Sequence, residues 1–247
     1  DNDGKFAAFM LNEEADKLIS LKSDINALFN SPVLGYNSKD DIVYQFWANR
    51  DSHEVYYFDP KTDYAPTTAI SSISWDDPNF PNIEGFGVWA AKCNFTMGPD
   101  GKMYSRMLGG NLVRIDVENA RGENLTNGDL VGTKDGSAYG LVFDPQDENV
   151  FYFSNNDKHC IYKYDLRTKE CACWAGQEGK SGYLDGPIGQ AMFNKPGQMC
   201  VDSEGNIILT DTENHCIRKI TMSTGYVSTL AGKPQNSGYV NGSAEDA

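Results

Sequence analysis

The sequence has little positive charge and no long apolar run. Its 21 Lys and Arg residues stand against 35 Asp and Glu residues, which gives a formal net charge of −14. A field of this sign repels phosphate backbones, so we do not expect nucleic-acid binding. No apolar stretch reaches the length of about 18 residues that a spanning helix needs, and the start (DNDGKFAAFM) is neither basic nor extensively apolar. We therefore expect neither a membrane span nor an uncleaved signal peptide in these residues.

The chain also lacks the composition of a disordered protein. Hydrophobic residues make up 40% and charged residues 23% of its 247 residues, which is an ordinary globular mixture. A chain of this length forms one large domain or two small ones and buries a sizeable core.

An internal repeat with a period of 56 residues (215 − 159 = 56) is the most informative pattern. The segment NNDKHCIYKYDLRTKECACWAGQEGKSGYLDG from residue 155 corresponds to DTENHCIRKITMSTGYVSTLAGKPQNSGYVNG from residue 211. Periods of this size are typical of propellers and solenoids. Weaker copies precede these two. The five expected copies cover 1–30, 31–70, 86–131, 138–176 and 197–232, with 71–87 as an inserted loop.

Each copy contains short runs in which large apolar residues alternate with polar ones, a pattern typical of strands. In the last copy these runs are 197–202, 206–211, 216–221 and 226–232; in the preceding copy they are 140–144, 149–155, 160–165 and 171–176. In the third copy, NGDLV (127–131) is the expected fourth strand.

A four-stranded sheet of this size cannot bury both faces alone, so consecutive copies must stack around an axis. We predict an all-β fold: a β-propeller of four-stranded antiparallel blades. It is expected to be six-bladed when complete and present here as an incomplete ring of about five copies. A sandwich or a long meander would not explain why the same loop composition recurs at each strand transition.

One repeat resembles a known family. TDTENHCIRKI (210–220), with FNKPGQMCVDSEGNIIL (193–209) before it and GYVSTLAG (225–232) after it, resembles the NHL-repeat family of β-propellers. The connector and the NHCIRKI segment are similar to secreted or surface-anchored NHL proteins of Gram-negative gut bacteria, which often carry a preceding TIG domain. The resemblance implies an extracellular, cell-surface or periplasmic location, with a lipid anchor or a TIG domain outside this segment. It transfers the fold better than the function.

Three histidines occupy one repeat position, at the turn between the second and third strands: His53, His159 and His215. Polar side chains stabilise hairpins at such turns, so we interpret them as structural and predict no metal site. The six cysteines are interpreted as free thiols. Aspartates in the loops leave a calcium ion as a minority alternative: Asp157, Asp185, Asp202 and Asp211.

Residues at which one copy departs from the repeat are the candidates for ligand binding, because symmetry does not explain them. The loops from fourth to first strand and from second to third strand open on one face of a propeller, beside the channel mouth. The candidates on that face are Trp89, Lys92, Asn94, Arg106, Tyr139 and Gln198. Aromatic rings beside hydrogen-bonding side chains suit a sugar or a peptide. The alternative is that these residues pack an irregular blade.

The sequence therefore predicts a noncatalytic binding or scaffold module that presents propeller loops to a glycan, a peptide or a protein partner. It contains no Gly-x-Ser-x-Gly motif, and we predict no catalytic residue and no cofactor. The alternative is a hydrolase or lyase with its site at the channel mouth, partly metal-dependent. The sequence leans towards the binding module and leaves the enzyme open.

Overall fold

A computed structural model describes residues 96–106, 111–116, 119, 121–126, 140–238 and 241–244, together with the backbone of the strands between residues 6 and 75. The chain divides into two compact units. One comprises Asp1–Tyr104 with Arg114–Asn124, and the other comprises Ser105–Val113 with Leu125–Ala247.

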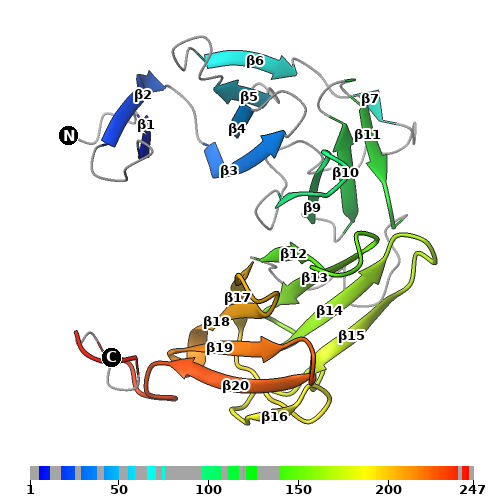
Figure 1. Ribbon diagram of the computed structural model, residues 1–247, viewed down its shortest axis with the longest axis vertical. Coiled ribbons are helices and arrows are strands. Elements are labelled where there is room, and N and C mark those ends of the chain that lie inside the picture. The colour runs from blue at the N-terminus through cyan, green and yellow to red at the C-terminus, as the bar shows by residue number, and fades with distance from the viewer. Residues whose placement is uncertain are drawn as a thin grey trace. The chain divides into compact units, whose positions relative to one another are not determined.

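The first unit contains antiparallel sheets formed by strands that follow one another in the chain (Figure 1). β1 (Phe6–Leu11) pairs with β2 (Leu18–Ile25). A four-stranded sheet follows in the order β3-β4-β5-β6. Its strands are β3 (Phe29–Asn37), β4 (Ile42–Asn49), β5 (Val55–Phe58) and β6 (Pro66–Ile70).

A five-stranded sheet has the order β7-β11-β10-β9-β8. Its strands are β7 (Ser74–Trp75), β8 (Thr96–Met97), β9 (Met103–Arg106), β10 (Leu112–Asp116) and β11 (Arg121–Asn124). The prediction of 127–131 as the fourth strand was wrong, because that strand is β11. The amide of Asn119 donates to Asp116 Oδ1 over 3.0 Å, which tightens the turn, so β11 follows β10 earlier than expected. β7 comes from the 71–87 segment and pairs in parallel with β11.

The second unit contains the two best-preserved copies of the repeat. Each forms an antiparallel sheet in chain order, and β16 adds a fifth strand beside β20. The predicted alternation is confirmed by the burial of side chains along β19, where every second residue is buried. The strands are β12 (Leu141–Phe143), β13 (Val150–Asn155), β14 (Cys160–Asp165), β15 (Cys171–Gly176), β16 (Gly186–Pro187), β17 (Pro196–Val201), β18 (Ile207–Asp211), β19 (Cys216–Thr221) and β20 (Tyr226–Ala231).

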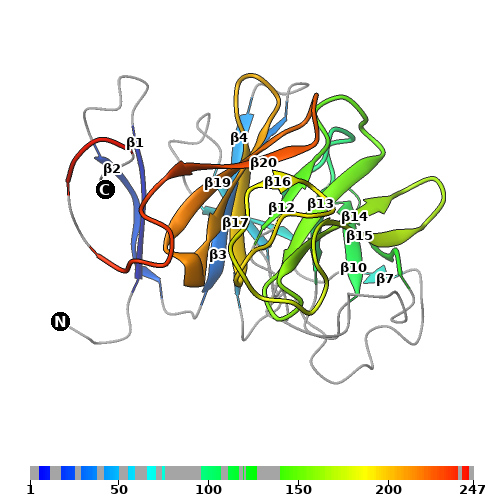
Figure 2. The same ribbon diagram turned by 90° about the horizontal axis from the view of Figure 1, so that it is seen from below.

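The main apolar core of this unit lies between these two sheets. Ile161 and Ala175 from the earlier sheet pack in one cluster with Ile207 and Leu209 from the later one, and Phe193, which precedes β17, completes it. β17 contacts both β12 and β13, and Figures 1 and 2 show it beside them. Sheets that each bury one face against a neighbouring copy of themselves are the blades of a β-propeller. The fold is therefore all-β and of the β-propeller class.

Arg218 on β19 binds residues 183–193, which lie in the segment that connects the two sheets. Its side chain is fully buried and meets two carboxylates, two backbone carbonyls and two aromatic rings. These partners are Asp211 Oδ2 (2.7 Å), Asp185 Oδ1 (2.6 Å), Met192 O (3.1 Å), Leu184 O (2.9 Å), and the rings of Tyr183 (4.8 Å) and Phe193 (5.2 Å). A buried guanidinium needs such a set because each unpaired N–H in the interior costs free energy.

Of the residues that the structure describes, none belongs to a helix with the length and apolar character that a bilayer span requires.

Candidate functional site

Two of the three repeat histidines lie where the sequence predicts, immediately before β14 and β19. His159 has φ 54° and His215 has φ 55°, which is the left-handed region. Few non-glycine residues adopt this region, and histidine is among those enriched there. Each histidine therefore ends the turn that leads into a third strand. His53 lies outside the described residues.

A polar pocket of about 410 Å³ lies at the same end of the two sheets as these turns. It is bounded by the turn after β13, the start of β17 and the turn after β18, which begins with the 3₁₀ helix η4 (Thr212–Asn214). The lining residues are Asn156, Lys195, Gly197, Gln198, Thr210, Thr212 and Glu213. The described lining residues thus include two with side-chain amides, two with hydroxyls and one ion pair, and none of those described is aromatic.

The backbone at Gly197 makes room for the two threonine hydroxyls. A Cβ atom at this position would lie 2.6 Å from Thr210 Oγ1 and 3.1 Å from Thr212 Oγ1. A side chain there would push into the pocket wall, so the glycine allows β17 to approach β18 closely. The hydroxyls of Thr210 and Thr212 consequently lie close to Gly197, the neighbour of the exposed Gln198.

Two hydrogen bonds hold the rim of the pocket, one between the two sheets and one within the later sheet. The Lys195 amide donates to His159 Nδ1 over 3.1 Å, and the Thr212 amide donates to the Lys195 carbonyl over 3.3 Å. Lys195 Nζ lies 3.4 Å from Glu213 Oε1, with about half of each side chain exposed (47% and 49%). An exposed pair of this kind contributes little to stability. Its two charges are therefore available to a ligand.

The pKa of His159 is lowered from its ordinary value of 6.5, first by burial and then by the positive charge of Lys195, while Asp157 and Asp211 act in the opposite direction. Neutral His159 is also what the hydrogen bond from the Lys195 amide requires, because Nδ1 must be an acceptor. The unfolded chain therefore binds more protons than the folded chain just below pH 6.5, and stability rises with pH across that window.

We expect the free energy of unfolding to fall as the pH is lowered from about 7 to about 5.5, and His159→Asn to show a smaller fall. Asparagine tolerates the left-handed backbone and keeps an acceptor but does not titrate. Urea unfolding of both proteins at a series of pH values measures this slope. His53 and His215 are present in both proteins, so their contributions cancel. Identical slopes of the free energy of unfolding against pH for the two proteins would show that His159 does not cause the pH dependence.

The structure describes two of the six predicted ligand residues. Gln198 lines the pocket and is exposed, whereas the Arg106 side chain at the end of β9 is buried (1% exposed). Trp89, Lys92, Asn94 and Tyr139 lie outside the described residues.

Sequence reasoning missed the other pocket residues, because it assigned repeated turn positions to architecture. One signal for Lys195 and Glu213 was available. They belong to the fourth-to-first and second-to-third strand loops, which are expected to open on the same face.

Among the side chains that are described, no three of His, Cys, Asp or Glu gather closely enough to hold a metal ion. Two of the aspartates considered for calcium, Asp185 and Asp211, contact Arg218. Five cysteines in these ranges carry free thiols: Cys160, Cys171, Cys173, Cys200 and Cys216.

Comparison with known families bears on the last copy of the repeat. Residues 193–220, from Phe193 into β19, match the family described as NHL repeat. NHL repeat-containing protein 2 from Bos taurus is 30% identical over an alignment of 112 residues, which covers 39% of this chain but only 15% of that protein.

Solved structures extend the similarity to the other copies. A structural genomics protein of unknown function from Bacteroides thetaiotaomicron has a TM-score of 0.72 at 21% identity, with 97% of this chain and 56% of that chain covered. An auxiliary nutrient binding protein from the same organism has a TM-score of 0.63 at 18% identity, with 91% and 51% covered. Virginiamycin B lyase from Staphylococcus aureus has a TM-score of 0.55 at 12% identity, with 93% and 64% covered. At these identities the likeness shows the fold alone, and this chain spans only part of each structure.

Proposed function

We propose that this chain is a noncatalytic binding module whose ligand occupies the polar pocket at the turn end of β17 and β18. The single observation that carries the proposal is the lining of that pocket. Hydroxyls of Thr210 and Thr212, the amide of Gln198 and the Lys195–Glu213 pair offer both donors and acceptors around about 410 Å³. A space of this size and polarity fits one or two sugar rings or a short peptide.

The chemistry of the pocket favours a hydroxyl-rich or amide-rich ligand over an apolar one. Amide side chains both donate and accept hydrogen bonds, and hydroxyls do the same, so several ligand orientations can be satisfied. The half-exposed ion pair adds one charge of each sign without a net field. A glycan or a peptide is therefore the ligand class that we propose, with a protein surface presenting such a segment as its natural source.

Similarity to an auxiliary nutrient binding protein from Bacteroides supports a binding role and, with it, a cell-surface or periplasmic location. Similarity to a lyase of the same fold supports the second candidate, a hydrolase or lyase at the channel mouth. His159, whose Nδ1 accepts the Lys195 amide, is not among the described residues that line the pocket, and this favours the binding module there.

The test is binding of the purified chain to a panel of immobilised oligosaccharides and short peptides. We expect the wild type to retain one chemical class, and Gln198→Ala to bind that class at least about tenfold more weakly, because a lost hydrogen bond leaves a ligand group unpaired. Retention of no member of the panel, or equal retention by Gln198→Ala, would contradict the proposal.

Gln190→Ala is the matched control. Gln190 is an exposed glutamine on the turn after β16 and does not line the pocket. Its replacement is expected to leave binding unchanged. Mass spectrometry of the retained class after incubation separates the two candidate functions, since a hydrolase or lyase would cleave it and a binding module would not.

A further inference from the structure

Two cysteines lie on the same face of the neighbouring strands β14 and β15. Cys160 is paired with Gly176 across the two strands, and Cys173 is paired with Tyr162. Cys160 and Tyr162 share a face because alternate residues of a strand point to the same side. A register shift after Ile161 places one extra residue of β15 between the two pairs. Cys160 and Cys173 are therefore diagonal neighbours across the hairpin.

Gly176 is the neighbour that both cysteines share. A Cβ atom at Gly176 would lie 3.1 Å from Cys160 Cβ. The Cys173 sulfur lies 3.7 Å from the Gly176 carbonyl oxygen. The two thiols also form a hydrogen bond with each other. The sulfur atoms are therefore held together in the folded chain.

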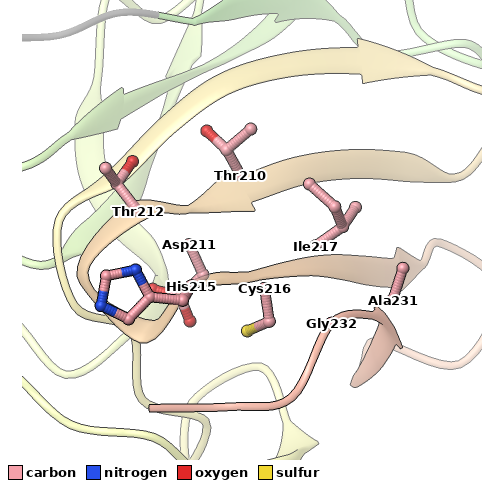
Figure 3. A pocket seen from close by; sticks show the side chains of 8 residues that line it. All are labelled: Thr210, Asp211, Thr212, His215, Cys216, Ile217, Ala231 and Gly232. Carbon is pink, nitrogen blue, oxygen red and sulfur yellow. The ribbon is translucent and has the colours of Figure 1, made fainter. Parts of the chain in front are cut away.

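The second copy of the repeat keeps this arrangement except for one residue. Cys216 and Gly232 are adjacent there (Figure 3), with a Cβ atom at Gly232 placed 3.3 Å from Cys216 Cβ, and β19 and β20 have a register shift at the equivalent position. The counterpart of Cys173 is Thr229 (229 − 173 = 56), whose hydroxyl lies 2.7 Å from the Tyr183 hydroxyl. The symmetry of the repeat thus accounts for the first cysteine of the pair and does not account for the second.

β15 is the strand that a covalent link between these cysteines would secure. In the later sheet β20 is flanked by both β19 and β16, whereas β15 pairs with β14 alone among the strands that the structure describes. A strand held on one side opens more readily than one held on both. A bond from Cys160 to Cys173 would close the hairpin and restrain this outer strand.

The two thiols differ in exposure and in acidity. Cys173 is partly exposed, whereas Cys160 is completely buried. The pKa of Cys173 is lowered, first by the hydrogen bond from Cys160 and also by one from the Glu178 amide, against the effects of burial and of the Glu178 charge. The pKa of Cys160 is raised by the same thiol pairing and by burial. Because the thiolate is the nucleophile in thiol–disulfide exchange, Cys173 is the thiol that reacts first.

We propose that Cys160 and Cys173 form a disulfide by exchange with a small disulfide such as oxidised glutathione. The Cys173 thiolate attacks one sulfur of that disulfide, whose S–S bond breaks, and the first small thiolate leaves. The Cys160 thiol then gives its proton to water, and its sulfur attacks Cys173 Sγ and releases the second small thiolate. Two protein thiols are oxidised, and one small disulfide is reduced to two thiols. This inference does not depend on the proposed ligand pocket.

The test incubates the reduced wild-type chain with oxidised glutathione, blocks the remaining thiols with N-ethylmaleimide in denaturant, and identifies the unreduced tryptic peptides by mass spectrometry. Cleavage after Lys158, Lys163, Lys169 and Lys180 separates the two cysteines, so the disulfide joins peptide 159–163 to peptide 170–180. We expect this linked pair to contain at least about ten times more of Cys160 than any other disulfide of that residue, because a thiol held beside its partner has a high effective concentration.

Cys171→Ser is the matched control, because Cys171 lies in the same peptide but is paired with Tyr164. This variant is expected to keep the linkage, whereas Cys173→Ser is expected to lose it. Cys160→Ser is expected to stop after the first step and to accumulate glutathione on Cys173. Glutathione adducts without a linkage in the wild type, or a linkage that survives Cys173→Ser, would overturn the proposal.

Discussion

Arg218→Ala is expected to lower the free energy of unfolding by about 3–5 kcal/mol, because it removes one partner of a buried ion pair and leaves the other charge behind. Asp211 has no exposed surface and lies 2.7 Å from the guanidinium. Burial already raises the pKa of the Asp211 carboxyl, so the unpaired carboxylate must either be protonated or remain in an apolar site. The carbonyls of Leu184 and Met192 each lose one donor as well and keep only a backbone one. Urea unfolding measures the loss.

Two comparison variants test whether the stability loss comes from the buried network of Arg218 or would follow from removing any cation on β19. Lys219→Ala removes a partly exposed pair with Asp202 and should cost less than about 1 kcal/mol. The double variant Asp211→Asn/Arg218→Tyr installs the residues found 56 positions earlier, Asn155 and Tyr162. It leaves no unpaired charge in the interior, since the remaining Asp185 is 35% exposed, and should recover at least about half of the loss. A small cost for Arg218→Ala would show that the network is not needed.

Phe193→Ala is expected to cost about 3–5 kcal/mol, because the ring is fully buried where two sheets meet. Its removal empties the space beside Gly176 and leaves the Arg218 guanidinium, 5.2 Å from the ring, without that aromatic face. Cys160, which lies beside Gly176 and is buried in the wild type, should then become accessible to thiol reagents.

Leu230→Ala is the control, because it removes an apolar side chain that does not pack between the two sheets. Leu230 is 45% exposed on β20, so its truncation should change stability by no more than about 0.5 kcal/mol. Chemical denaturation with thiol labelling at matched pH measures both effects. A cost for Phe193→Ala similar to that for Leu230→Ala would mean that the two sheets do not depend on this ring.

The strands could be predicted from local patterns, because apolar and polar residues alternate at consecutive positions along a strand. The predicted runs 160–165 and 216–221 are β14 and β19 to the residue. Burial in β13 is complete rather than alternating, since that strand has a neighbouring sheet on one side and aromatic pairs on the other, such as Phe151 with Tyr164. The fold class could therefore be predicted from repeat and alternation together.

Contacts between segments that are distant in the chain could not be predicted from the sequence. Asp185 and Arg218 are 33 residues apart and meet only because the connector returns across β19. The parallel pairing of β7 with β11 joins the inserted segment 71–87 to the third copy of the repeat. Of the candidate site, Gln198 could be found because it departs from the repeat, whereas Thr212 and Glu213 belong to the repeated turn and carry no such signal.

The most direct test of the ligand pocket is amide hydrogen exchange of the wild-type chain with and without the glycan or peptide that it retains from the panel. A ligand in the pocket contacts the start of β17 and the turn after β18, and bound backbone exchanges more slowly. Slower exchange confined to peptides covering 194–199 and 210–214 is the predicted result. Unchanged exchange in both segments, with slowing elsewhere in the chain, would contradict the account.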